Sequence, residues 1–376
     1  MATDWRWALL HYLGPGGYPG FRFSDWFRLL RDNRFSVGPT YLNRAFVNTL
    51  STLTISPIAQ FEQWRYGDKI SKTNVVAPLF ILGHWRSGTT FLHQLLALDS
   101  QFAFPNLHQV SFPHTFLSTE ASSTRLTQFL LPRIRPFDNV RQHWEMPYED
   151  EIAIATLTLR SPYLCGLFPH RTENYDRYLN FDDVPSHEVD EWRAGFMLFL
   201  KKLTWKYQRP LVLKSPTHTC RIRLLLELFP NAKFIHIHRN PFDVFQSTIH
   251  LINKGIGLTC FQRADQEDWT TRTLRVYRDM YEKFFLEKKL IPDGDFHEIR
   301  FEELENDPCR QVQAIYEALS LPPLVEQSKL KEYLNSVAGY RKNNLPTIPV
   351  ETENRITTEW ERCFDEWGYS KIVKRT

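Results

Sequence analysis

Cysteine, methionine and long apolar runs are all scarce in this chain of 376 residues, which has 5 Cys and 4 Met. The cysteines form no Cys-x-x-Cys pair and no zinc-type pairing with His, so we expect free, mostly buried thiols, a reducing compartment and no metal. They are Cys165, Cys220, Cys260, Cys309 and Cys363. No apolar run approaches the roughly 20 residues of a membrane span, and Asp4 and Arg6 interrupt the apolar start that a signal peptide needs. A cytoplasmic protein is expected.

A strong charge of either sign is also missing. The chain has 46 basic and 43 acidic residues, a formal net charge of +3, so we do not expect nucleic acid as its main partner. Hydrophobic residues make up 42% and aromatic residues 14%. This composition supplies the core of one large or two modest domains.

The most informative stretch runs from Pro78 to Leu98. The apolar run at 79–82 predicts a buried strand. A Gly-x-x-x-x-Gly turn follows from Gly83 to Gly88, and Thr89 opens an apolar helical pattern. Such a turn between a strand and a helix presents backbone N–H groups to an anion, and the helix N-terminus adds partial positive charge.

Two positions distinguish this loop from that of a nucleotide kinase. A kinase loop carries Lys and then Ser or Thr after its second Gly, where this chain has Thr89 and Thr90. The cation is Arg86, inside the loop, so no lysine reaches the β- and γ-phosphates of a triphosphate. The loop therefore predicts a nucleotide with a 5′-phosphate and no triphosphate tail, and it disfavours a P-loop-like small-molecule kinase.

A second unit, at 210–238, indicates how the anion-binding groups converge. Its pattern is a strand at 211–213, a loop, a helix at 219–229 and a strand at 233–237, which predicts a parallel βαβ unit. Ligands of such sheets lie beyond the carboxyl ends of the strands, where Lys214 and Arg239 stand. The expected fold class is therefore α/β, a parallel sheet flanked by helices.

Arg239 and Ser247 form a third candidate site. Pro241 suits the first position of a helix, and Ser247 follows Arg239 by about two turns, so one ligand could touch both. An arginine fork suits phosphate. The alternative is that Arg239 makes only a structural salt bridge.

Together these motifs resemble the PAPS-dependent sulfotransferases, and most closely their bacterial-type group, over residues 78–367. PAPS is 3′-phosphoadenosine-5′-phosphosulfate. The shared pieces are residues 83–90, Glu-Asp-Glu at 149–151, Leu-Lys-Ser-Pro at 213–216 and Trp-Gly-Tyr at 367–369. The resemblance implies a three-layer P-loop-like fold, PAPS as co-substrate and no metal.

The resemblance also implies roles for individual residues. Arg239 and Ser247 match the pair that holds the 3′-phosphate, and Lys214 matches a strand-end lysine that stabilises the leaving phosphate. Five loop residues would hold the 5′-phosphosulfate: Arg86, Ser87, Gly88, Thr89 and Thr90.

Three further positions match the family pattern less closely. Phe91 stands where an aromatic residue packs on adenine. Phe301 stands where the family usually has Tyr. Arg341 resembles part of a C-terminal phosphate loop, but the glycine of that loop is absent here.

The sequence leaves three candidates for the general base, two carboxylates and a histidine. Cytosolic sulfotransferases use a His two residues after the strand-end lysine, but Pro216 stands there, and His218 follows two residues later. Golgi-type members use a Glu, for which Glu149 and Glu151 are candidates. The alternative for this acidic cluster is electrostatic stabilisation of a helix start, predicted at Met146–Leu159.

The N-terminal region is predicted to be a helical cap, at 1–75, before a sulfotransferase domain at 76–376. Residues 105–209 would be a largely helical insertion on the acceptor side. In the cap, Leu42, Phe46, Leu50, Leu53 and Ile55 are predicted to fall on one face of a helix. Either this face packs on the main domain, or it serves as a membrane-surface contact or a lipid entrance.

The acceptor is expected to be a hydroxyl or amine of a small molecule, lipid or carbohydrate. Besides the kinase, a catalytically silent nucleotide-binding module is an alternative function. Such a module would keep Arg239 and Ser247 but would not depend on Lys214.

Overall fold

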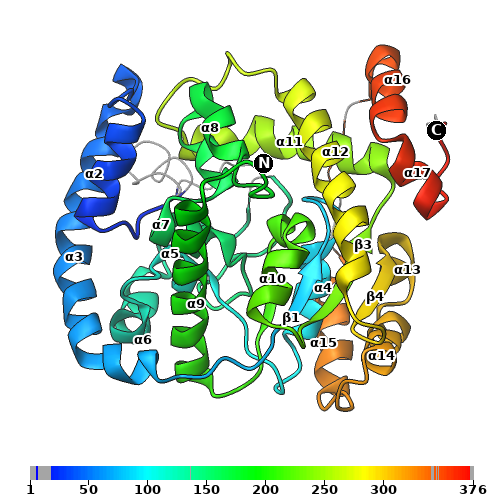
Figure 1. Ribbon diagram of the computed structural model, residues 1–376, viewed down its shortest axis with the longest axis horizontal. Helices are drawn as coiled ribbons and strands as arrows, with labels where there is room; N and C mark the ends of the chain where they lie inside the picture. Colours follow the sequence, from blue (N-terminus) through cyan, green and yellow to red (C-terminus); the bar gives the residue numbers. More distant parts are fainter. Residues whose placement is uncertain are drawn as a thin grey trace. The chain divides into compact units, whose positions relative to one another are not determined.

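The structure, a computed structural model, describes Arg6 and residues 18–135, 137–339, 343, 345 and 347–372 (Figure 1). These residues form two compact units. The first contains the described residues up to Val75, with Phe104–Arg209 and Asn253–Glu267. The second contains Val76–Ala103, Pro210–Ile252 and the described residues from Asp268 onward.

The second unit is built on a four-stranded parallel sheet in the order β2-β1-β3-β4 (Figure 1). The strands are β1 (Leu79–Leu82), β2 (Val212–Lys214), β3 (Lys233–His238) and β4 (Phe296–Arg300). Phe80 of β1 stands opposite Leu213 of β2 and Phe234 of β3. The predicted α/β class with a parallel sheet is confirmed.

Helices cover both faces of this sheet, because successive side chains of a strand point to opposite sides. On one face, Ile81 and Ile235 pack with Leu95 of α4 and Ile315 of α14 in one hydrophobic cluster. On the other face, the ring of His236 lies 4.2 Å from that of Phe284 of α12. The helices of this unit are α4 (Thr89–Leu96), α10 (Ile222–Leu228), α12 (Trp269–Glu287), α13 (Phe301–Asn306), α14 (Pro308–Ala318), α15 (Gln327–Val337), α16 (Val350–Glu359) and α17 (Glu361–Trp367). One more helix, α11 (Pro241–Thr259), begins in this unit and ends in the first.

The predicted start of the helix after β2 is wrong. The helix expected at 219–229 is a 3₁₀ turn, Pro216–Cys220, followed by α10, because Pro216 initiates the turn and Arg221 has a non-helical backbone at ψ 22°. Strand β4 ends at Arg300, and Phe301 is the first residue of α13.

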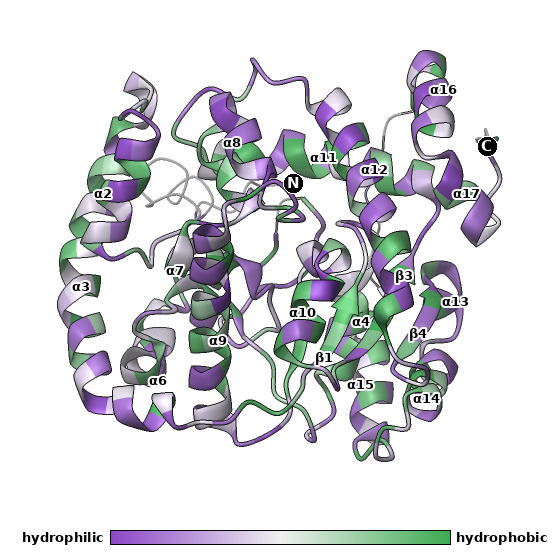
Figure 2. Cartoon of the chain, viewed as in Figure 1, coloured by the Kyte–Doolittle hydropathy of each residue, from purple (hydrophilic) through white to green (hydrophobic). Residues whose placement is uncertain are grey.

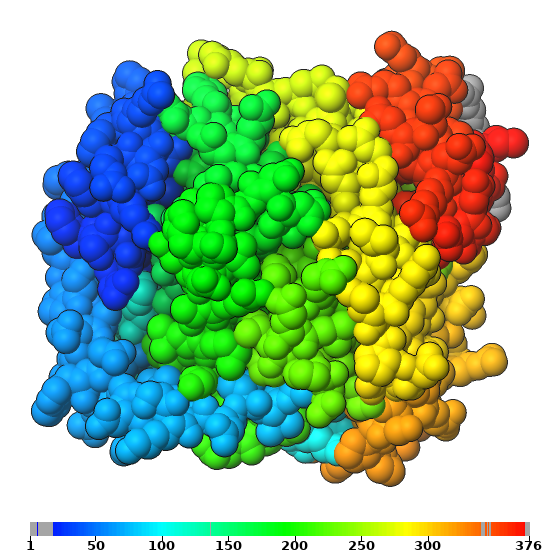
Figure 3. Space-filling model, viewed as in Figure 1, coloured from blue at the N-terminus to red at the C-terminus, as the bar shows by residue number. Residues whose placement is uncertain are grey.

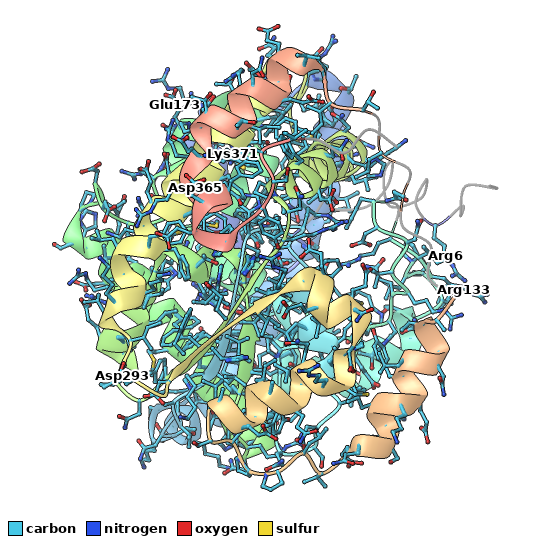
Figure 4. The ribbon with its side chains drawn as sticks, turned by 90° about the vertical axis from the view of Figure 1, so that its right-hand side faces the viewer. Arg6, Arg133, Glu173, Asp293, Asp365 and Lys371 are labelled. Carbon is cyan, nitrogen blue, oxygen red and sulfur yellow. The ribbon has the colours of Figure 1, made fainter. Side chains whose placement is uncertain are left out.

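The C-terminal segment contains two short helices, α16 and α17. Trp360, at φ −112° and ψ 17°, separates α16 from α17. Gly368 then ends α17 in the left-handed conformation, at φ +64°. Lys371 turns back to α17, with its Nζ 2.8 Å from Asp365 (Figure 4).

The first unit is helical. Its helices are α2 (Phe23–Asp32), α3 (Leu42–Ser71), α5 (Leu107–Ser111), α6 (Phe116–Thr127), α7 (Glu151–Thr158), α8 (Thr172–Asp176) and α9 (Ser186–Tyr207). The helix predicted from Met146 begins only at Glu151. Pro147 disfavours a helical residue before it, and the N–H of Tyr148 donates to the carbonyl of Pro105. Glu149 therefore lies before the helix.

Helix α3 turns several of its large apolar residues outward. Leu42, Phe46 and Leu53 are 57%, 63% and 57% exposed, and Leu50 is exposed as well. The face that packs on α2, α6 and α9 carries Arg44, among other buried residues. Of the five apolar residues expected on one face, these four are therefore exposed and Ile55 is buried.

Two predictions made from what the sequence lacks can be compared with the structure. The five cysteines are free, and all but Cys309 are buried, which confirms the expected thiols. Among the described residues, no helix is both long and apolar enough to cross a membrane.

Candidate functional site

Two glycines allow the loop after β1 to lie close against the rest of the sheet edge. Gly83 has φ +143° and Gly88 has φ +100°. A Cβ at Gly83 would lie 2.5 Å from the carbonyl oxygen of Ile237, and one at Gly88 would lie 2.2 Å from the ring of Phe301. No side chain caps the start of α4 after Gly88. The first N–H groups of this helix are therefore suited to an external anion.

The rest of the loop is fixed by hydrogen bonds from neighbouring elements. The N–H of Gly83 donates to Oγ1 of Thr219 at 2.8 Å, and the N–H of His84 donates to the hydroxyl of Tyr281 at 3.1 Å. Within the loop, Ser87 Oγ donates to the carbonyl of His84 at 2.7 Å. Arg86 has φ +72°, in the left-handed region. Left-handed residues in such a turn aim successive N–H groups into one concavity.

The structure brings Arg86 together with Arg239 and Ser247, although Arg239 follows Arg86 by 153 residues in the chain. Arg86 Nε donates to Ser247 Oγ of α11 at 2.8 Å. Arg239, directly after β3, donates from Nη1 to the carbonyl of Arg86 at 3.4 Å. Two of the three motifs predicted from the sequence thus form one cationic cluster.

Arg239 makes the structural ion pair that the sequence left as an alternative. Its Nη2 lies 3.1 Å from a carboxylate oxygen of Asp243, which is in the first turn of α11. Its Nε, however, is buried and has no hydrogen-bond partner among the residues that the structure describes. A buried N–H donor without a partner is costly. An anion bound at this guanidinium would satisfy it.

The three remaining cofactor candidates have different surroundings. Phe301 lies under Arg239, with the guanidinium carbon 4.7 Å from the ring centroid, and the same ring covers Gly88. It therefore joins the loop to Arg239 rather than only filling the core. Phe91 is partly buried against the hydrophobic cluster of the sheet. Arg341 lies outside the described residues.

Lys214 lies at the end of β2, and His218 lies in the turn that follows this strand. Lys214 is the last residue of the strand, opposite Ile81 of β1, and its side chain is buried. This register puts Lys214 at the same edge as the Gly83 loop. His218 is fully buried, and its ring packs edge-on against Phe80 at 5.2 Å. Such packing restricts the access of an acceptor to His218.

A group that the sequence reasoning missed lies directly beside Arg239. Glu302 accepts hydrogen bonds from the N–H of Asn240 at 3.1 Å and from the hydroxyl of Tyr369 at 2.8 Å. The Tyr369 oxygen lies 3.1 Å from Nδ1 of His238. Burial and the neighbouring His236 lower the pKa of His238 to about 3. A neutral His238 can donate Nδ1–H to Tyr369, so these bonds hold the backbone on both sides of Arg239.

His84, within the loop, was also not singled out from the sequence. Burial lowers its pKa to about 4, so the ring is neutral at physiological pH. Its Nδ1 lies 2.8 Å from the carbonyl oxygen of Trp85. Because a carbonyl can only accept, Nδ1 carries the proton and Nε2 is the unprotonated nitrogen.

The candidate bases Glu149 and Glu151 belong to the first unit. Glu149 is half-buried and accepts from the hydroxyl of Tyr163 at 2.5 Å. Glu151 is fully buried and accepts from Ser161 Oγ at 2.6 Å. Burial, with these two carboxylates nearby, raises the pKa of Tyr18 well above its ordinary value. Among the three candidate bases, only Glu149 is both a carboxylate and partly exposed.

Comparisons with known proteins place the chain in a family. Residues 78–326 match the sulfotransferase family. The chain is 33% identical over 354 residues to omega-hydroxy-beta-dihydromenaquinone-9 sulfotransferase Stf3 of Mycobacterium bovis, which covers 94% of this chain and 91% of the relative. The same protein of M. tuberculosis matches equally. The chain therefore belongs to the sulfotransferase family and is a transferase.

Solved structures show the same fold. Sulfotransferase STF9 of M. avium aligns with a TM-score of 0.68 at 17% identity, covering 97% of this chain and 96% of that one. Sulfotransferase STF1 of M. tuberculosis aligns with a TM-score of 0.61 at 16% identity, covering 95% and 99%. These likenesses confirm the predicted P-loop-like architecture, and the family assignment favours a sulfotransferase over the kinase and the silent module.

Proposed function

We propose that this sulfotransferase uses PAPS as its donor and transfers the sulfuryl group to a hydroxyl of a lipid acceptor, releasing adenosine 3′,5′-bisphosphate. The observation that carries the donor is the cluster of Arg86, Ser247 and Arg239 beside the glycine loop. It offers one cationic site at the loop and a second at Arg239, whose buried Nε has no partner among the described residues. Two separate phosphate groups, at the 5′ and 3′ positions, suit this arrangement.

The residues of the chain fit the proposed donor. The loop N–H groups and Arg86 would bind the 5′-phosphosulfate, and Arg239 with Ser247 the 3′-phosphate. PAPS supplies an activated sulfuryl group whose transfer leaves negative charge on a phosphate oxygen. Lys214, at the end of β2, and Arg86, in the loop after β1, would stabilise that charge. Among the described residues, no cluster of His, Cys, Asp or Glu has the form of a metal site.

For the base we propose Glu149 ahead of Glu151 and His218. A general base must come within hydrogen-bond reach of the proton it accepts. Glu151 is fully buried and engaged by Ser161, and the ring of His218 is fully buried against Phe80. Glu149 is partly exposed, so an acceptor hydroxyl can approach its carboxylate.

The proposed acceptor class rests on the relative named for a hydroxylated menaquinone, which is similar over nearly the whole chain. The test is transfer of radiolabelled sulfuryl from PAPS to a panel of acceptors: an ω-hydroxylated prenyl quinone, a simple long-chain alcohol, a sugar and an amine. We expect labelling of the lipid alcohols. Labelling of the sugar or amine alone would contradict the acceptor class.

The same assay tests the role of Lys214. Replacing Lys214 with Ala should lower turnover by about 100-fold or more, because a buried cation that acts on developing charge contributes several kcal/mol. The affinity for adenosine 3′,5′-bisphosphate should change much less. Lys233→Ala is a matched control, since Lys233 begins β3 and pairs with Asp295 at 2.6 Å. Unchanged turnover in Lys214→Ala would remove this lysine from the mechanism.

A further inference from the structure

An ordinary surface helix turns its large apolar residues toward the protein core. Helix α3 instead has a stripe of large apolar residues on its outer face. Its apolar stripe, defined here as Leu42, Phe46, Leu50, Leu53, Phe61 and Trp64, is exposed, and Trp64 reaches 77% exposure. These positions fall within about 100° of the helix circumference and span about 33 Å along its axis. An exposed apolar patch of such length marks an interaction surface. Figure 3 shows the atoms of this region, in light blue, at the surface.

The charges of the helix avoid this stripe. From Ala45 to Phe61 the sequence has no charged residue at all. The only charged side chains that flank this segment, Arg44 and Glu62, are buried. Figure 2 shows green and pale colours along α3. A surface helix normally keeps charge on its outer face, so this segment is not built to face water.

Buried polar contacts specify the orientation of the helix. Arg44 donates from its two terminal nitrogens to the carbonyls of Cys260 and Gly257, at 2.7 and 3.0 Å. Glu62 forms a buried ion pair with Lys202 at 2.5 Å and accepts from the N–H of Ser118. Turning the helix over would expose apolar partners and break these contacts. The outward stripe is therefore a fixed feature of the first unit.

Helix α2 extends the apolar surface beside the stripe. The N–H of Phe23 donates to Ser56 Oγ, and Trp26 Nε1 donates to Thr49 Oγ1, each at 2.9 Å, so α2 lies along α3. Three exposed phenylalanines, Phe23, Phe27 and Phe35, stand on and just beyond α2. Phenylalanine and tryptophan side chains of this kind insert readily at a lipid interface.

The charge around this surface is positive. Among the described residues from 18 to 75, two acidic side chains are exposed, Asp32 and Asp68. Six exposed cations stand in the same segment: Arg22, Arg31, Arg34, Arg65, Lys69 and Lys72. Basic groups at the margin of an apolar surface attract anionic lipid headgroups. This charge complementarity favours a lipid bilayer over a second, equally basic copy of the same surface.

We propose that the apolar stripe of α3, with the phenylalanines of α2, docks the protein onto the surface of an anionic bilayer. The helix lies in the interface and does not span the membrane. The proposal goes beyond the proposed function and does not depend on the donor or the acceptor, since it rests on exposed residues of the first unit alone. It explains why the segment of α3 from Ala45 to Phe61 has no charged residue.

The test is flotation of the full chain with vesicles of phosphatidylcholine containing about 30 mol% phosphatidylglycerol, a composition chosen to supply anionic headgroups. The wild type should float with these vesicles, and less with pure phosphatidylcholine or at high salt. The variant Phe46→Glu/Leu53→Glu/Trp64→Glu should partition at least tenfold less. A matched control, Leu126→Glu/Leu286→Glu/Val325→Glu, changes equally exposed apolar residues elsewhere and should float like the wild type.

A single conservative variant guards against misfolding of the triple variant. Brominated lipids should quench the tryptophan fluorescence of the wild type more than that of Trp64→Phe, because Trp64 enters the lipid. Wild-type protein that does not float would overturn the proposal, as would equal flotation of the triple variant. Sedimentation that shows a dimer, dissociated by the triple variant, together with no flotation, would assign the surface to a second copy instead.

Discussion

Arg239 is the residue at which the two phosphate groups of the proposed donor can be told apart. Replacing it with Ala should weaken binding of adenosine 3′,5′-bisphosphate by about 1.5–3 kcal/mol, the usual contribution of a charge-assisted hydrogen bond. Binding of adenosine-5′-phosphosulfate, which lacks the 3′-phosphate, should change little. Arg263→Ala is a control, because Arg263 pairs with Asp265 at the surface. An equal loss with both nucleotides would contradict the assignment of Arg239.

The identities of these residues could be predicted from the sequence, but their contacts could not. The glycine spacing and the strand-end positions indicate an anion site at one edge of the sheet. They do not indicate that Ser247 would accept from the Arg86 side chain, or that Phe301 would lie under Arg239. Such contacts depend on the register of strands far apart in the chain. The local sequence does not show which of Glu149 and Glu151 is buried. The choice between them as candidate base therefore also depends on the structure.

Among the elements, the C-terminal segment has the least expected part in the site. Trp367 stacks on His238 at 4.7 Å, and Arg300 lies over the ring of Tyr369 at 4.5 Å. Tyr369 then reaches Glu302, which also holds the N–H of Asn240. The Trp-Gly-Tyr segment thus contacts the residues on both sides of Arg239 in the chain, and we propose that it helps to position the guanidinium.

This positioning role predicts the effect of Tyr369→Phe. Losing the hydroxyl should lower the free energy of unfolding by about 1.5–3 kcal/mol, as for a hydrogen bond to a carboxylate. It should also weaken the binding of adenosine 3′,5′-bisphosphate several-fold. Tyr333→Phe is the matched control, because Tyr333 donates to Gln94 at 2.6 Å away from Arg239. If both variants lose stability but neither loses nucleotide affinity, the segment is only structural.

The outward stripe of α3 shows where periodicity stops being informative. Apolar residues at helical spacing predict a helix and a common face. The helix forms, but Ile55 is buried on the other side of α3 from the exposed Leu42 and Leu53. The same spacing does not say whether that face meets the protein or its surroundings. Only the buried contacts of Arg44 and Glu62, to residues distant in the sequence, decide the direction.

For the whole molecule, buried histidines predict sensitivity to acid. The folded pKa of His84 is about 4 and that of His238 about 3, both below the ordinary value of 6.5. The unfolded chain therefore binds protons that the folded chain does not, and stability falls as pH decreases from about 6.5 toward 4. At pH 5 each histidine should cost about 2 kcal/mol.

Thermal unfolding between pH 7.5 and 5 measures this effect, with the range set by the ordinary histidine pKa. The melting temperature of the wild type should fall on acidification, and the melting temperature of His84→Gln should fall less steeply. The exposed His187 provides the control, since His187→Gln should follow the wild type. A melting temperature that is constant or rises toward pH 5 would contradict the neutral, buried state of these histidines.

The central claim is that the loop and the Arg239 site together hold a nucleotide with separate 5′ and 3′ phosphates. Calorimetric titration with adenosine 3′,5′-bisphosphate, compared with ATP plus magnesium, tests it most directly. The account predicts tight binding of the bisphosphate and weak binding of ATP, because the loop has Thr89 where a triphosphate-binding lysine would stand. The reverse preference would contradict the account.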